Sequence, residues 1–161
     1  MATLYYDRDA DPALIKGKQV GVIGYGSQGH AHAGNLADAG VRVKVGLPPT
    51  SSSIAAAKAA GHEVAPPAEV AAWADVVMVL APDTAQPKLW RDHLAPHLDG
   101  RPDKLLLFAH GFNVHYGTIA PAAGLDVALI APKAPGHRVR ETYRDGQGVP
   151  ALIAVHAGAS A

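Results

Sequence analysis

A glycine-rich stretch at residues 24–29 constrains the fold of this chain more than any other feature. A short apolar run at residues 20–23 leads into Gly-Tyr-Gly-Ser-Gln-Gly, and residues 30–39 are typical of a helix. Between a strand and a helix, the pattern G-x-G-x-x-G indicates a dinucleotide-binding turn far more strongly than the bare pattern does. Its glycines permit a tight turn, a close approach of pyrophosphate, and close packing of helix on strand. We therefore predict an anion-binding corner at the helix N-terminus, with an empty glycine-rich turn as the alternative.

The composition fits one globular domain and excludes several classes of function. The chain has 161 residues, a formal net charge of zero and 17% charged residues, so nothing predicts attraction to nucleic acid or to an anionic membrane. It contains no cysteine, which excludes disulfides, thiolate metal sites and cysteine nucleophiles. No apolar run approaches the roughly 20 residues of a membrane span, and the N-terminus lacks the pattern of a signal peptide. We expect a cytoplasmic protein.

Apolar runs alternate with helical patterns along the chain. Strands are predicted at residues 20–23, 41–45, 76–80, 105–109, 127–131 and 150–155, with a short edge piece at 64–66 and helices at 54–60, 68–74 and 85–98, the last interrupted near Pro96. This alternation predicts an α/β fold, a doubly wound parallel sheet of the Rossmann type with about six strands in the order 3-2-1-4-5-6. Ligands of such sheets bind beyond the carboxyl ends of the strands, so we expect the exits at Gly24, Gly46, Ala81, His110 and Pro132 to share one crevice.

The end of the second predicted strand bears on which nicotinamide cofactor would bind. NAD-binding sheets usually place an acidic residue about 20 residues beyond the glycines, where it bonds the ribose hydroxyl. Here the strand ends in Lys44-Val-Gly-Leu47 without an acid, and the following loop carries Ser51, Ser52 and Ser53. Hydroxyl and N–H groups can hold a 2′-phosphate, so NADP is favoured over NAD. The alternative for the serines is that they cap the next helix.

Six stretches spread over the whole chain carry a further pattern. They are Asp-Ala-Asp at 9–11, Gly-Tyr-Gly-Ser-Gln-Gly-His-Ala-His-Ala at 24–33, Ala-Pro-Asp-Thr-Ala-Gln at 81–86, Ala-His-Gly-Phe-Asn at 109–113, Ala-Pro-Lys-Ala-Pro-Gly-His at 131–137 and Gly-Val-Pro-Ala-Leu-Ile-Ala at 148–154. Together they resemble ketol-acid reductoisomerase (acetohydroxy acid isomeroreductase) in its short, bacterial-type form. The motifs at 109–113 and 131–137 are highly specific to that family.

The resemblance implies an activity and a missing part. The family converts acetohydroxy acids such as 2-acetolactate into 2,3-dihydroxy acids in branched-chain amino-acid biosynthesis. An alkyl migration assisted by magnesium precedes hydride transfer from NADPH. Residues 1–161 correspond to the N-terminal NADP-binding domain, whereas the helical C-terminal domain, which carries the magnesium-binding carboxylates, most of the substrate pocket and the oligomer interface, has no counterpart here. We therefore expect a helical domain or a partner chain, and no turnover by this chain alone.

The resemblance also implies roles for individual residues. His110 matches the active-site histidine of the family, and Lys133 matches a lysine that lines the same pocket. From the residues alone, His110 could equally hold its loop through a hydrogen bond, and Lys133 could be a solvated loop lysine. Pro48 stands where the family has an arginine near the 2′-phosphate. With the glycine motif included, the predicted cofactor-binding residues are Gly24, Tyr25, Gly26, Ser27, Gln28, Gly29, Ser51, Ser53, Asp83, Thr84, Ala85, Gln86 and Gly136.

Other chemistries are less well supported by the sequence. Magnesium requires converging carboxylates, and the acids at 7, 9 and 11 have no second cluster, so no metal ligand is predicted in this chain. His93 and His97 have helical spacing, but Pro96 disrupts that turn and no third zinc ligand is apparent. A hydrolase elbow would need glycine where Tyr25 stands before Ser27. Two alternatives stay open: a free-standing NADP-binding module, and a related reductase that needs a partner chain.

Overall fold

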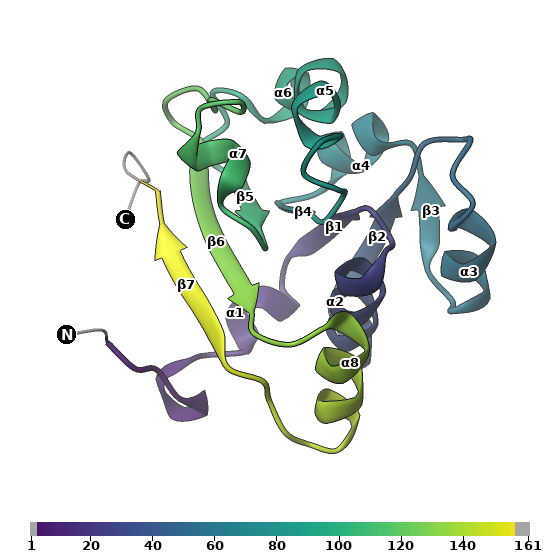
Figure 1. Cartoon of the computed structure of the whole chain (residues 1–161), viewed down its shortest axis with the longest axis vertical. Helices are drawn as coiled ribbons and strands as arrows, with labels where there is room; N and C mark the ends of the chain where they lie inside the picture. Colours follow the sequence, from purple (N-terminus) through teal and green to yellow (C-terminus); the bar gives the residue numbers. More distant parts are fainter. Residues whose placement is uncertain (1–2, 157–161) are drawn as a thin grey trace.

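Seven strands form one sheet in the computed structural model, which describes residues 3–156 (Figure 1). The spatial order of the strands is β3-β2-β1-β4-β5-β6-β7. Strands β1 to β6 pair in parallel, whereas β7 runs antiparallel to β6 at the edge. The bounds are β1 Gln19–Ile23, β2 Arg42–Gly46, β3 Glu63–Ala65, β4 Val76–Val79, β5 Leu105–Phe108, β6 Asp126–Pro132 and β7 Ala151–Val155.

The predicted Rossmann-type architecture is confirmed, with corrections at both edges of the sheet. The segment predicted only as a short edge piece is a full strand, β3, paired with β2 from Lys44↔Glu63 to Gly46↔Ala65. With the six predicted strands numbered along the chain, the order 3-2-1-4-5-6 put residues 76–80 at the edge beside residues 41–45, and this placement is wrong. The edge position belongs to β3, the strand at 76–79 pairs with β1 as β4, and the number of strands rises from six to seven. Strand β7 is antiparallel because it starts beside the carboxyl end of β6, where Pro132 pairs with Ala151. Parallel sheets often carry one antiparallel edge strand of this kind.

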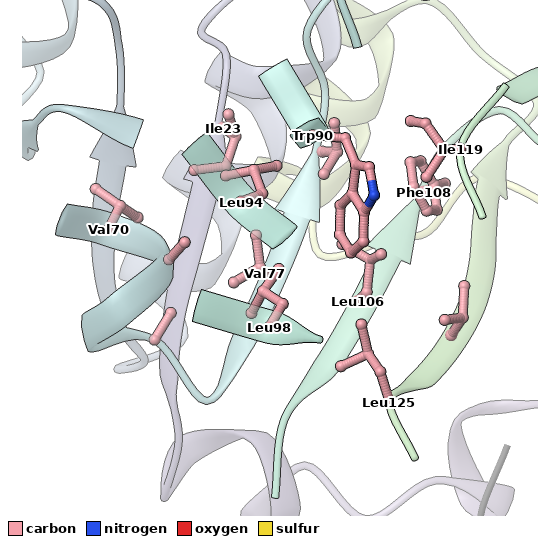
Figure 2. Close-up of a cluster of buried hydrophobic side chains, with 14 residues drawn as sticks. Ile23, Val70, Val77, Trp90, Leu94, Leu98, Leu106, Phe108, Ile119 and Leu125 are labelled. Carbon is pink, nitrogen blue, oxygen red and sulfur yellow. The ribbon is translucent and has the colours of Figure 1, made fainter. Parts of the chain in front are cut away.

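One face of the sheet is covered by helix α4 (Pro67–Trp73) and by a continuous helical segment. That segment consists of α5 (Gln86–Leu89), the π-helical turn η2 (Trp90–Leu94) and α6 (Ala95–Leu98). Figure 2 shows Trp90, Leu94 and Leu98 packed over Val77 and Leu106 of the central strands. All four residues of β4 are buried, as a continuous apolar run covered on both faces should be. The interruption predicted near Pro96 lies at the π turn just before it, where the N–H of Ala95 donates to the carbonyl of Trp90.

The other face is covered by α2 (Ser27–Asp38) and α3 (Ile54–Ala59), and α8 (Gly136–Arg144) packs along α2 (Figure 1). Small buried residues of α2, such as Ala31 and Ala33, let this helix sit close to the strands. Arg140 of α8 lies over Gly34 and donates to the side chains of Asn35 (2.8 Å) and Asp38 (2.7 Å). The remaining short helices are η1 Asp7–Asp9, α1 Ala13–Lys16 and α7 Phe112–His115. No helix within residues 3–156 is long and apolar enough to cross a membrane.

Two partly buried histidines give the fold a dependence on pH. The imidazole of His32, on α2, has its Nε2 buried without a hydrogen-bond partner among the described residues. Burial lowers the pKa of His32 below its usual 6.5. Burial, and then the nearby Arg140, lower the pKa of His62 in the same direction, against a smaller opposite effect of Asp38. Both imidazoles therefore resist protonation in the folded chain.

We expect the free energy of unfolding to decrease as the pH falls below about 6.5, the value at which these histidines protonate in the unfolded chain. Their contribution is fully present above that pH and is lost as the pH falls through the lower folded-state values. Urea denaturation between about pH 8 and pH 5 measures the slope. His32→Gln should make the slope shallower, because a neutral amide does not titrate. An identical slope in the variant would contradict the assignment.

Candidate functional site

The three glycines of the predicted corner differ in what surrounds them. Gly24 has φ +103°, and a Cβ there would lie 2.7 Å from the backbone N of Ala81. A Cβ on Gly29 would overlap the carbonyl oxygen of Gly24, so this residue lets α2 close onto the turn. Around Gly26, by contrast, a Cβ would meet nothing within 4 Å. The turn thus requires two of its glycines for its own packing and leaves the third facing open space, as expected where a ligand approaches the backbone.

The corner also has the electrostatics of an anion site. Helix α2 begins at Ser27, spans 12 residues, and has neither a side-chain cap nor an acidic residue in its first turn. The N–H groups and the partial positive charge at this end are therefore not neutralised by a carboxylate of the helix itself. The ring of Tyr25 packs edge-on against the imidazole of His62, with the two ring centroids 5.7 Å apart. Burial raises the pKa of Tyr25 above its usual value of 10.0, against a smaller opposite effect of Arg140.

The loop that leads into α8 packs directly behind this corner. The N–H of Gly136 donates to the hydroxyl of Ser27 (3.1 Å), and Gln28 Nε2 donates to the carbonyl of Ala134 (2.9 Å). A Cβ on Gly136 would overlap the backbone carbonyl of Ser27. The side-chain oxygen of Gln28 is buried and has no partner within the described part of the chain. Segments about 106 residues apart thereby fix the first turn of α2.

A cavity of about 650 Å³ lies in front of the corner, at the carboxyl ends of the strands. It is bounded by the glycine corner, by the loop after β2 and by the loop after β4, a size suited to a cofactor. The predicted cofactor residues that line it are Gly24, Tyr25, Gly26, Ser27, Gln28, Ser51, Ser53, Asp83 and Ala85. Four others lie outside the lining: Gly29 beneath the turn, Gly136 behind Ser27, Thr84 at the surface and Gln86 in the interior.

The loop after β2 shows how the serines are used. Ser51 and Ser53 line the cavity together with Pro48. Ser53, at the N-terminus of α3, makes no side-chain capping bond of its own. Instead the hydroxyl of Ser51 accepts a hydrogen bond from the N–H of Ser53 (3.2 Å), which leaves its own proton available. Among the residues that line the cavity, Asp83 is the one acid.

The exits of β5 and β6 were expected to share this crevice, but His110 and Pro132 are not part of its lining. His110 nevertheless reaches its rim, because its Nδ1 lies 3.0 Å from Oδ2 of Asp83. Lys133 is exposed at the end of β6, and its backbone N–H donates to the carbonyl of Pro150 (2.8 Å). The structure thus links one of the two predicted catalytic residues to the crevice, and the role of each stays a prediction.

Two buried amides next to His110 were not singled out for this position by the sequence. Asn113 is buried, and its Nδ2 donates to the backbone carbonyl of Asp83 (3.0 Å) and to Oε1 of Gln86 (2.9 Å). Gln86, predicted to touch cofactor, instead holds the carbonyl of Ala81 (2.8 Å) and Oδ1 of Asp83 (3.3 Å). In the sequence, Gln86 follows Asp83 by three residues and Asn113 follows His110 by three. This repeated spacing is the signal that could have indicated the two amides.

Other potential sites are weaker. A second hollow, of about 210 Å³, lies between α7 and strands β5 to β7, and mainly apolar side chains such as Phe108, Val114 and Val155 line it. It offers no charged group to an anion except His115 or His156 in protonated form. Across residues 3–156, no three histidine, aspartate or glutamate side chains are grouped closely enough to hold a metal ion.

Comparison with known proteins decides the family. Residues 14–161 match the model of the family described as acetohydroxy acid isomeroreductase, NADPH-binding domain. The chain belongs to this family. A solved ketol-acid reductoisomerase from an uncultured archean, described as NADH-preferring, is 39% identical with a TM-score of 0.89. That match covers 93% of this chain and 46% of the other, so the chain spans about half the length of this ketol-acid reductoisomerase.

More distant structures share the fold alone. A putative NADP oxidoreductase from Bacteroides fragilis is 20% identical with a TM-score of 0.66, and the match covers 89% of this chain and 53% of that one. An imine reductase variant from Myxococcus stipitatus, solved with NAD+, is 21% identical with a TM-score of 0.57 over 76% of this chain and 43% of its own. The isomeroreductase domain is therefore built on a sheet that oxidoreductases of other kinds also use.

Proposed function

We propose that this chain is the NADP(H)-binding domain of a ketol-acid reductoisomerase and that the cofactor lies in the cavity in front of the glycine corner. The observation that carries the proposal is Gly26. It is the glycine of the corner around which a Cβ would find open space, and it lines the cavity immediately before the uncapped N-terminus of α2. A pyrophosphate can approach a backbone that carries no side chain, and the partial positive charge of a helix N-terminus without an acidic residue attracts it.

Different residues of this chain would bind the two ends of the cofactor and carry the proton transfer. The N–H groups of the first turn of α2 bind the pyrophosphate, and the hydroxyls of Ser51 and Ser53 hold the 2′-phosphate at the other end. When bound, the cofactor supplies the hydride. His110, at the rim beside Asp83, would take up or release a proton of the substrate, and the ammonium of Lys133 would stabilise a developing oxyanion.

The full reaction is the part of the proposal that depends on the family. By its resemblance, the protein would isomerise and reduce 2-acetolactate or a similar acetohydroxy acid for branched-chain amino-acid biosynthesis in the cytoplasm. The described residues do not provide a cluster that fits the magnesium ion of that chemistry, and we assign no step to it. A helical domain or a partner chain would complete the substrate pocket. A module that only binds NADP(H) is the second candidate, since the residues that line the cavity form a cofactor site and His110 lies only at its rim.

The preference between NADPH and NADH is open to a direct test. The absence of an acid at the end of β2 favours NADPH, whereas Pro48 in place of an arginine removes a cation from the 2′-phosphate loop. The family model is described as NADPH-binding and the related reductoisomerase as NADH-preferring, so both cofactors are named for this domain. Titration of the chain with each cofactor, followed by the fluorescence of the reduced nicotinamide, measures the ratio of the two dissociation constants. Failure of both cofactors to bind would overturn the proposed function.

Ser51→Asp should shift this ratio towards NADH by at least about tenfold. A carboxylate at the 2′ position would repel the phosphate of NADPH and accept a hydrogen bond from the ribose hydroxyl of NADH. The matched control is Ser52→Asp, which adds the same charge one residue along the loop but outside the cavity lining. Equal shifts in both variants would mean that the loop acts only through its overall charge, and no shift in Ser51→Asp would place the 2′-phosphate elsewhere.

A further inference from the structure

The contact between Asp83 and His110 differs from an ordinary surface ion pair. The two side chains are 38% and 67% exposed, and Oδ2 of Asp83 lies 3.0 Å from Nδ1 of His110. A pair this exposed usually contributes little to stability, because water competes and both side chains lose freedom. Here, however, the carboxylate belongs to a chain of hydrogen bonds that begins in the interior of the domain. That chain determines which way each group faces.

The interior end of the chain is Asn113, which is 1% exposed. Its Oδ1 accepts from the hydroxyl of Thr118, and its Nδ2 donates to Oε1 of Gln86 (2.9 Å) and to the carbonyl of Asp83 (3.0 Å). Rotating the amide by half a turn would point its oxygen at two acceptors. The orientation of Asn113 is therefore set by its surroundings, and with it that of Gln86, whose oxygen must face Asn113.

The orientation of Gln86 in turn fixes the carboxylate of Asp83. Gln86 is 3% exposed, and its Nε2 donates to the carbonyl of Ala81 (2.8 Å) and to Oδ1 of Asp83 (3.3 Å). With Oδ1 engaged, Oδ2 of Asp83 is the atom presented to His110. A carboxylate can only accept, so the nitrogen that faces it must carry a proton. The ring is further restrained by Phe112, whose plane lies at 16° to it with centroids 6.4 Å apart.

We infer that Asp83, braced by Gln86 and Asn113, is a positioning residue that holds the neutral imidazole of His110 in the Nδ1–H tautomer. Nε2 of His110 is then the nitrogen with the free lone pair, turned away from the carboxylate. A proton-transfer role for that nitrogen rests on the proposed function, whereas the tautomer itself does not. Asp83, predicted from the sequence as a cofactor contact, thereby gains a second role at the rim of the cavity.

The brace makes an unusual prediction for Asp83→Asn. Because Gln86 Nε2 continues to donate, the new amide must turn its oxygen towards Gln86 and its NH₂ group towards His110. The amide would then donate to Nδ1, which must lose its proton, and the tautomer should invert to Nε2–H. We expect the ratio of the Nδ1–H to the Nε2–H form to fall by at least about tenfold, given the strength of a hydrogen bond to a charged acceptor.

The experiment is ¹⁵N NMR of the full chain labelled at histidine, at about pH 8.5, where imidazoles are ordinarily neutral. Long-range ¹H–¹⁵N couplings distinguish the two tautomers, and the spectrum of His110→Gln assigns the signal among the nine histidines. Asp92→Asn is the matched control, since Asp92 pairs with Lys88 and Arg91 on the surface of the helical segment. It should leave the His110 signal unchanged.

Each result of these NMR experiments bears on one part of the inference. A parent chain with His110 as Nε2–H, or an Asp83→Asn chain that keeps the parent tautomer, would overturn the inference. In the double variant Asp83→Asn, Gln86→Leu the amide is free to turn, so the Nδ1–H form should recover in part; no recovery would overturn the bracing role of Gln86. NADPH is also titrated into the parent sample. If the parent chain does not bind NADPH but the tautomers are as expected, the proposed function alone is overturned; if it binds NADPH but the tautomers are not as expected, this inference alone is overturned.

Discussion

Gly26→Val is expected to leave the stability of the chain nearly unchanged and to weaken NADPH binding by at least about a hundredfold. The backbone of Gly26 is extended, with φ −88° and ψ −154°, and does not have the positive φ that would require glycine. A Cβ at this position meets no atom of the protein within 4 Å. The free energy of unfolding should therefore change by no more than about 0.5 kcal/mol, as for other substitutions of open surface.

Cofactor affinity should respond in the opposite way, because the open space beside Gly26 is the space that the pyrophosphate needs. A valine side chain there would keep the phosphates from the N–H groups of α2. Titration with NADPH measures the loss, and urea denaturation checks the stability. Gly17→Val is the control, since Gly17 also has a negative φ and open surroundings but lies outside the cavity. Binding of NADPH by Gly26→Val with parental affinity would move the pyrophosphate away from this corner.

The glycine corner could be predicted from the sequence because its determinants are local. Gly24 and Gly29 have steric reasons within a few residues or on the adjacent strand, and the flanking apolar run and helix are short-range patterns. The direction of β7 could not be predicted in this way. Its sequence, Ala151–Val155, suits either pairing, and what decides is where the chain returns after α8. That return depends on the packing of α8 against α2, which no local pattern encodes.

The hydrogen-bond chain behind His110 lay beyond the sequence for a related reason. Asn113 and Gln86 are 27 residues apart, and the orientation of each amide depends on the acceptors that the fold brings around it. Lys104 is a parallel case. It ends a polar turn, yet its ammonium is buried and donates to the carbonyls of Ala71, Ala72 and Ala74 at the end of α4. Asparagine, glutamine and lysine side chains are mostly exposed in folded proteins. Here, tertiary hydrogen bonds keep all three of these side chains buried.

Gly136→Ala is expected to impair both stability and cofactor binding, which distinguishes it from the change at Gly26. An alanine Cβ would overlap the backbone carbonyl of Ser27, and backbone on both sides leaves no flexible side chain to move away. The start of α8 would have to separate from the first turn of α2, and the hydrogen bond from Gly136 to the Ser27 hydroxyl would be lost. We expect the free energy of unfolding to fall by about 3 kcal/mol or more, at the upper end of the cost of overpacking.

The effect on the cofactor follows from the same contact. Ser27 and Gln28 form the first turn of α2, and the loop before α8 holds them through Gly136 and the carbonyl of Ala134. Displacing that loop should misplace the N–H groups that bind pyrophosphate, so NADPH affinity should fall by about tenfold even where the chain remains folded. Gly148→Ala, in open surroundings between α8 and β7, is the matched control and should match the parent in both measurements. If Gly136→Ala unfolds at the parental urea concentration, α8 is not anchored at this glycine, and the corner must be held by α2 and the sheet alone.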